Sequence, residues 1–137
     1  MKVYPSQGRE DLLVNEIGYY AGNRMLVADT YDVEIAADGP WLIRVIPMAW
    51  DETASGVVAG KGDDIRGLFT PLISRTAYQF THQGQSNFAV YLVCDTHKDL
   101  LVNEIGRYNG EAMVVFRDAK GCLWDVTADG TWTITPK

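Results

Sequence analysis

The chain repeats part of itself. The octapeptide Asp-Leu-Leu-Val-Asn-Glu-Ile-Gly occurs at residues 11–18 and again at residues 99–106, a spacing of 88. The same spacing relates Tyr20 to Tyr108, Gly22 to Gly110, Met25 to Met113 and Val27 to Val115. After a three-residue difference in length, Ala-Asp-Gly-Pro-Trp at 37–41 recurs as Ala-Asp-Gly-Thr-Trp at 128–132. An internal repeat predicts that one supersecondary unit is built more than once.

The first copy of the repeat is incomplete. At a spacing of 88, Val3 falls opposite Tyr91 and Pro5 opposite Val93, so the chain begins inside the repeat. Residues 60–87 have no counterpart in the first copy. The sequence therefore contains about one and a half repeats.

We expect one β-sandwich domain over residues 1–137, in which the half copy supplies strands that the full copy lacks. Its parts are a half repeat at 1–47, a connecting loop at 48–59 and a full repeat at 60–136. The alternative is a complete sandwich at 57–137 beside a half copy that another molecule completes, as in a homodimer. Half a sandwich leaves open sheet edges, which favour pairing with another chain.

Hydrophobic periodicity predicts an all-β fold. No segment keeps an apolar period of 3.6 residues over three turns, whereas short alternating runs are frequent. Asp-Gly at 38–39 and Asn-Gly at 109–110 are hairpin signals. About twelve short strands are predicted. They are drawn from the extended segments at 2–5, 12–17, 24–28, 32–36, 41–46, 56–59, 65–69, 75–82, 87–94, 100–105, 111–117, 122–127 and around 132–134. This pattern favours an antiparallel, jelly-roll-like β-sandwich with an internal pseudo-repeat.

Charge and hydropathy narrow the function classes. The net charge is -6, and Lys and Arg are scattered rather than clustered, so we expect no nucleic-acid partner. No run of about 18 apolar residues is present, so we expect no membrane-spanning helix. The N-terminus lacks an apolar signal core, which leaves the localisation open.

The two cysteines, Cys94 and Cys122, both lie in apolar strand-like runs. The favoured interpretation is a pair of reduced, buried thiols. A disulfide between them is the alternative, and it would need an oxidising compartment.

Specific catalytic motifs are absent, and the sequence offers weak candidates instead. A Ser-His-Asp triad can be written from Ser86, His82 and Asp95, but such triads depend on geometry, and His82 is more typical of a loop-pinning residue. Asp63 and Asp64 are the candidate metal ligands, because loop carboxylates suit Ca²⁺. The competing interpretation is a turn in which Asp side chains cap backbone amides. No other cofactor is expected.

Loop aromatics and the positions where the two copies differ suggest a ligand surface. Exposed aromatic rings suit a sugar or a peptide, although core packing is the competing interpretation for most of them. The residues singled out are Tyr19, Tyr20, Trp50, His82, Arg107 and Tyr108.

Several of these motifs together resemble a known kind of module. They are Gly-Asp-Asp at 62–64, Phe-x-His-x-Gly at 80–84, Asn-Phe-Ala-Val at 87–90, the octapeptide at 99–106 and Ala-Asp-Gly-x-Trp-x-Ile at 128–134. The combination resembles a small β-sandwich module that recurs in bacterial proteins, especially actinobacterial and other Gram-positive ones. It is also similar, in architecture, to bacterial pre-peptidase C-terminal domains, which are jelly rolls. The resemblance covers residues 57–137 and, as a half copy, residues 1–47.

The resemblance implies a non-catalytic accessory or binding module, often on secreted proteins, and it carries no catalytic residues onto this chain. We therefore expect a non-enzymatic module that recognises carbohydrate or protein, at a bacterial surface. The alternatives are a small hydrolase that uses His82 and a purely structural spacer.

Overall fold

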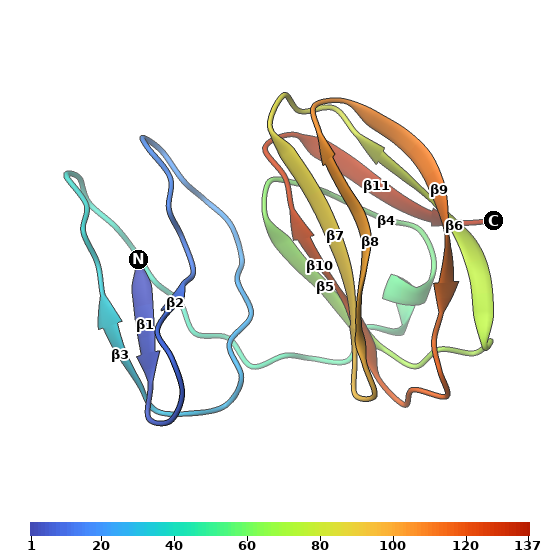
Figure 1. The fold of residues 1–137 in the computed structure, drawn as a ribbon, viewed down its shortest axis with the longest axis horizontal. Helices are drawn as coiled ribbons and strands as arrows, with labels where there is room; N and C mark the ends of the chain where they lie inside the picture. The colour runs from blue at the N-terminus through green and yellow to red at the C-terminus, as the bar shows by residue number, and fades with distance from the viewer.

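The computed structural model describes residues 1–137, which form eleven β-strands and one short 3-10 helix (Figure 1). The elements are β1 (Lys2–Pro5), β2 (Asp11–Leu12), β3 (Tyr31–Glu34), η1 (Glu52–Ser55), β4 (Val58–Lys61), β5 (Asp64–Phe69), β6 (Arg75–His82), β7 (Asn87–Cys94), β8 (Lys98–Ile105), β9 (Tyr108–Val115), β10 (Cys122–Thr127) and β11 (Thr131–Pro136). No helix in the structure has the length and apolar character needed to span a membrane.

Strands β4 to β11 form one long antiparallel ribbon that is rolled up. Its tip is the β7–β8 hairpin, and the flanking strands pair outward as β6 with β9, β5 with β10, and β4 with β11. Rolling also sets β10 beside β7 and β11 beside β6. The two resulting sheets have the orders β5-β10-β7-β8 and β4-β11-β6-β9, which is a jelly roll. The predicted all-β sandwich is confirmed.

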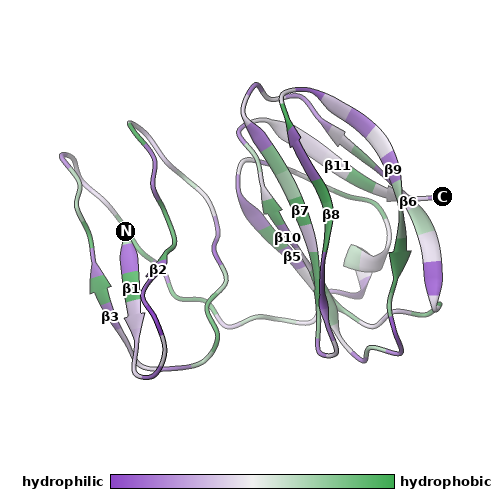
Figure 2. Cartoon of the chain, in the orientation of Figure 1, coloured by the Kyte–Doolittle hydropathy of each residue, from purple (hydrophilic) through white to green (hydrophobic).

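The core lies between these two sheets. Trp124 is fully buried near its middle, where its ring lies 5.8 Å from Phe69 and 5.1 Å from Tyr78 between centroids. The indole Nε1 of Trp124 donates a 2.8 Å hydrogen bond to the carbonyl of Ala54, so η1 is attached to the core. Every residue of this core cluster lies between positions 54 and 134. In Figure 2 the strand β7, which lies between β10 and β8 in its sheet, is hydrophobic over most of its length.

The half copy forms a separate three-stranded sheet in the order β2-β1-β3, beside the sandwich (Figure 1). It contributes no strand to either sandwich sheet. The expectation that it would supply strands to the full copy is not met, because the eight strands of residues 58–136 already form both sheets.

The pairings of β1 have the same register as those of β7 when β1 is shifted by 89 residues. Lys2↔Leu12 corresponds to Tyr91↔Leu100, Val3↔Asp11 to Leu92↔Asp99, Val3↔Val33 to Leu92↔Trp124, and Pro5↔Tyr31 to Cys94↔Cys122. The 88-residue alignment expected for β1 is therefore off by one residue. The reason is a longer connection, since five residues separate Pro5 from Asp11 but four separate Cys94 from Asp99.

Two of the predicted strands, 24–28 and 41–46, do not form. The repeat aligns 24–28 with β9, which pairs with β6, and 41–46 with β11, which pairs with β4 and β6. The half copy has no counterpart of β4 or β6, so these segments lack a neighbour for their backbone groups. Of the predicted strand at 12–17, only Leu12 lies in a strand, as the second residue of β2.

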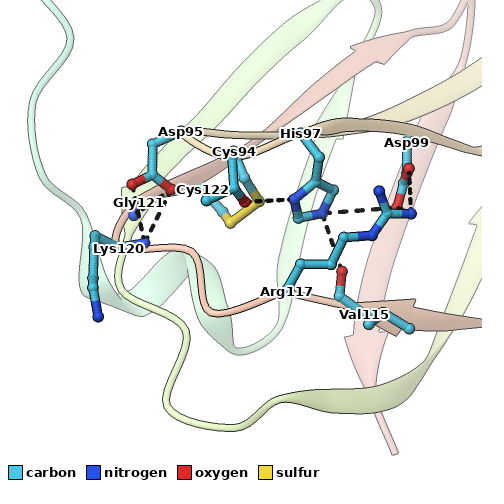
Figure 3. The surroundings of a disulfide bond; sticks show 10 residues. Cys94, Asp95, His97, Asp99, Val115, Arg117, Lys120, Gly121 and Cys122 are labelled. Atoms are coloured by element: carbon cyan, nitrogen blue, oxygen red, sulfur yellow. Dashed lines mark hydrogen bonds and ion pairs between the residues drawn. A yellow bond between two sulfur atoms is a disulfide. The ribbon is translucent and has the colours of Figure 1, made fainter.

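Cys94 and Cys122 form a disulfide bond, so the favoured expectation of two reduced thiols is wrong (Figure 3). The two residues are direct cross-strand partners on β7 and β10, with their Cα atoms 4.0 Å apart. Such close opposite pairs in antiparallel sheets bring side chains near one another. The bond links the two halves of the rolled ribbon.

Candidate functional site

His82 is fully buried at the end of β6, with its ring stacked on Phe88 at 4.6 Å. Its Nδ1 lies 2.7 Å from the carbonyl oxygen of Gly106, so Nδ1 carries a proton and donates. Its Nε2 lies 3.2 Å from Asp129 Oδ1 but is not aligned for a hydrogen bond. His82 thus connects β6, β7 and two turns, which is the loop-pinning role that the sequence favoured.

Asp129 holds the loop that follows His82. One carboxylate oxygen accepts hydrogen bonds from the backbone amides of Gln85 and Ser86, at 2.9 and 3.0 Å. Desolvation acts to raise the pKa of Asp129. The amide hydrogen bonds and the nearby His82 act against it, and the pKa ends below its usual range. Gly84 has no room for a side chain, because a Cβ there would meet both Asp129 and His82.

The structure does not bring together Ser86, His82 and Asp95, the three residues of the candidate catalytic triad. Ser86 precedes the eight-residue strand β7 and Asp95 follows it, so about 30 Å of extended chain separates them. Asp95 accepts hydrogen bonds from the amides of Lys120 and Gly121. The hydrolase hypothesis gains no support from this geometry.

The carboxylates of the candidate metal pair are occupied by protein donors. Asp63 accepts from the amide of Ala128 at 3.0 Å and from the Tyr20 hydroxyl at 2.9 Å, and Arg24 lies 3.1 Å away. Asp64 accepts from the side chain of Asn23, from Arg66 and from its own neighbouring amide at Ile65. No cluster of three or more His, Cys, Asp or Glu that could hold a metal is present. These contacts match the capping interpretation, and calcium stays an untested prediction.

Asp63 and Asp64 instead dock the half copy on the sandwich. Tyr20, Asn23 and Arg24 all come from the half copy, and Arg24 also donates to Thr127 Oγ1 at 3.0 Å. Partial burial, the hydrogen bond to Asp63 and the negative charge of Asp63 raise the pKa of Tyr20 to about 12. Sequence reasoning assigned Tyr20 to a ligand surface, whereas the structure places it in this junction.

The remaining candidate residues lie at different places. The Tyr19 side chain projects into solvent, and Arg107 is exposed on the turn between β8 and β9. Tyr108 packs against Phe88, with ring centroids 6.0 Å apart. Trp50 lines a hollow of about 340 Å³ beside the disulfide, together with Leu68, Cys94, Gly121 and others. The predicted ligand residues therefore do not converge on one pocket.

A polar cluster that sequence reasoning missed surrounds the disulfide (Figure 3). His97 Nε2 lies 3.1 Å from the carbonyl oxygen of Val115, and Arg117 donates to both carboxylate oxygens of Asp99. These contacts tie the β7–β8 hairpin to the segment that follows β9. Both residues sit at turns, and no sequence signal indicated that they meet.

Exposed apolar side chains concentrate in the half copy. Of the twenty large hydrophobic residues that are exposed, eleven lie in residues 1–47. Four of them align with core residues of the full copy, and we call these four the open-core residues: Leu26, Val33, Trp41 and Ile43. Their counterparts are Val114, Trp124, Trp132 and Ile134. The counterparts are at most 1% exposed, whereas the open-core residues are 41% to 62% exposed.

Comparison with known proteins identifies no relative, since no family model, no curated protein and no solved structure matches the chain.

Proposed function

We propose that this chain is a non-enzymatic module that recognises another polypeptide through its half copy. The observation that carries the proposal is the exposure of the open-core residues. A soluble protein rarely leaves a large set of core-type side chains in water unless a partner covers them. The edge of strand β3 that faces away from β1 has no neighbouring strand, and such free edges can bind an extended chain by strand addition.

Two further observations support a binding role over a catalytic one. The buried or partly buried side chains best suited to acid–base chemistry are His82, Asp63 and Asp129. Each of them instead holds a turn or joins parts of the fold. The disulfide suits an oxidising compartment, as expected for a module at a bacterial surface. The resemblance to bacterial accessory modules points in the same direction.

A polypeptide partner is favoured over a carbohydrate. Sugar sites need aromatic rings and polar groups gathered in one place, whereas Trp50 lines its hollow without Tyr19 or Trp41. The open-core residues are mostly aliphatic, which suits burial against another polypeptide rather than a polar glycan.

Photocrosslinking tests the proposal. A photoreactive amino acid is placed at position 33 in one variant and at position 113 in another, and each is produced in cells and irradiated. Val33 and Met113 are 50% and 57% exposed, so the two positions are matched in accessibility. We expect polypeptide adducts at 33 and none at 113. Equal adducts at both positions, or none at either, would overturn the proposal.

A further inference from the structure

The full copy shows what the half copy lacks. The rolled ribbon has two arms, β4 to β7 and β8 to β11, and each strand of one arm pairs with a strand of the other. The half copy holds the second arm and, as β1, only the last part of the first. This division of strands accounts for the observed pairing, because β1 pairs with both β2 and β3, as β7 pairs with both β8 and β10.

Some residues of the half copy lack the hydrogen-bond partners that their counterparts in the full copy have. Trp132 donates from Nε1 to the carbonyl of Gly62 at 2.9 Å, and its counterpart is the exposed Trp41. Asp129 accepts from the amides of Gln85 and Ser86, and its counterpart Asp38 has no such loop to hold. All of these partners lie within residues 60–87, the segment without a counterpart.

We propose that the half copy binds a polypeptide arm with the strand chemistry of residues 57–90, carried by a further unit of the same repeat. The inference rests on the proposed function and names its partner. The arm would supply equivalents of β4, β5, β6 and the first part of β7, and so complete a second jelly roll. It would cover the open-core residues and give strands 24–28 and 41–46 the neighbours they lack.

A second copy of this chain does not fit the same role. Each chain contains two arms of the β8–β11 type but only one complete arm of the β4–β7 type. That one arm is already paired within its own sandwich. Two copies of residues 1–137 therefore cannot complete one another, and the proposed arm belongs to a further repeat unit.

The register of β1 fixes how the arm should join. Lys2 occupies the position of Tyr91 in both of its pairings, so an arm that ends at Val90 continues directly into Lys2. The alternation agrees, because Val90 and Leu92 are buried in β7 and Val3 is buried in β1. A fusion of residues 57–90 to residues 2–137 should contain two complete sandwiches.

Hydrogen exchange on this fusion tests the inference. We expect amides in 24–28 and 41–46 to exchange at least about tenfold more slowly than in the unfused chain, since they gain ladder hydrogen bonds. The control is a fusion that ends at Ala89, which shifts the arm by one residue and turns its apolar side chains to the wrong face. Equal exchange in the two fusions would overturn the inference.

A second experiment uses the chain without fusion. The separate polypeptide 57–90 is added to the chain that carries the photoreactive group at position 33, and we expect a one-to-one adduct. Crosslinking of position 33 to other proteins but not to this arm would overturn the inference and leave the proposed function standing. Absence of any adduct would overturn both. A homodimer that buries Trp41 would identify a second copy as the occupant and also overturn the inference.

Discussion

At the scale of single residues, close packing decides which positions tolerate change. The indole of Trp132 lies directly against Gly60 on the neighbouring strand β4, so that a Cβ at Gly60 would overlap its ring. Trp132 is 1% exposed and belongs to the core cluster. The missing side chain of Gly60 is therefore what allows a tryptophan to fit at this edge of the sheet.

The variant Gly60→Ala should destabilise the sandwich. Its methyl group displaces the Trp132 ring, and overpacking of this kind costs about 1–3 kcal/mol. The matched control is Gly39→Ala, since Gly39 has open space around the added Cβ. Urea unfolding followed by fluorescence measures both variants. A Gly60→Ala midpoint equal to that of the parent chain would show that the ring moves without cost.

Asp129 predicts a specific acid sensitivity. Although desolvation opposes it, the amides of Gln85 and Ser86 and the proximity of His82 hold the pKa of Asp129 below its usual range. A lowered folded-state pKa stabilises the protein above the unfolded-state pKa, about 3.9 for Asp. That stabilisation is lost as the pH falls from about 4 through the folded-state value.

The variant Asp129→Asn should lack this component, so the difference in unfolding free energy between it and the parent should shrink below about pH 4. The control is Asp38→Asn at the equivalent position, where no loop is held. Urea unfolding at a series of pH values measures the effect. A difference that stays constant with pH would contradict the assignment.

At the scale of elements, the structure separates what a sequence pattern can predict from what it cannot. The alternation in 75–82 and the apolar runs at 87–94 and 122–127 predicted β6, β7 and β10 with the observed bounds. The pattern of 41–46 is equally strand-like, yet no strand forms there. A strand needs a neighbour for its backbone groups, and periodicity within one segment does not reveal whether that neighbour exists.

The same limit applies to the cysteines and to the candidate site. Whether Cys94 and Cys122 bond depends on the register of β7 against β10, which is a tertiary property. Tyr20 and Asp63 each drew attention separately, but they lie 43 positions apart and nothing in the sequence pairs them. The open-core residues could have been found by aligning Val33 and Trp41 with the core residues of the full copy.

The disulfide should contribute strongly to the stability of the sandwich. It links residues 28 positions apart in sequence, and constraining the unfolded chain over such a loop is worth about 3.5 kcal/mol. The double variant Cys94→Ala and Cys122→Ala should therefore unfold at lower urea concentration. Reductant should lower the midpoint of the parent chain and leave the double variant unchanged. An effect of reductant on both would point to a cause other than this bond.

At the scale of the whole molecule, one buried carboxylate joins the two parts. Asp63 holds the amide of Ala128 within the sandwich and, at the same time, Tyr20 and Arg24 of the half copy. The half copy thus has a defined contact with the sandwich at Asp63, although the two parts share no sheet. This contact would set the angle between successive sandwiches if an arm completed the half copy.

The variant Tyr20→Phe should weaken this contact between the half copy and the sandwich without unfolding either part. It removes the hydroxyl that donates to Asp63, a charge-assisted hydrogen bond worth about 1.5–3 kcal/mol when buried and less at this partly buried junction. Residual dipolar couplings report the relative orientation: one alignment tensor should fit both parts of the parent chain, and two should be needed for Tyr20→Phe.

Tyr19→Phe is the matched control, because the neighbouring Tyr19 is 95% exposed and should leave a single tensor. High pH should act as Tyr20→Phe does. Because the pKa of Tyr20 is raised to about 12, its neutral hydroxyl stabilises the docked state below about pH 10. That contribution is lost as the pH rises toward 12. Over this range we expect the parent chain to change from needing one alignment tensor to needing two. A parent chain that already needs two tensors at neutral pH would show that Asp63 does not hold the half copy in place.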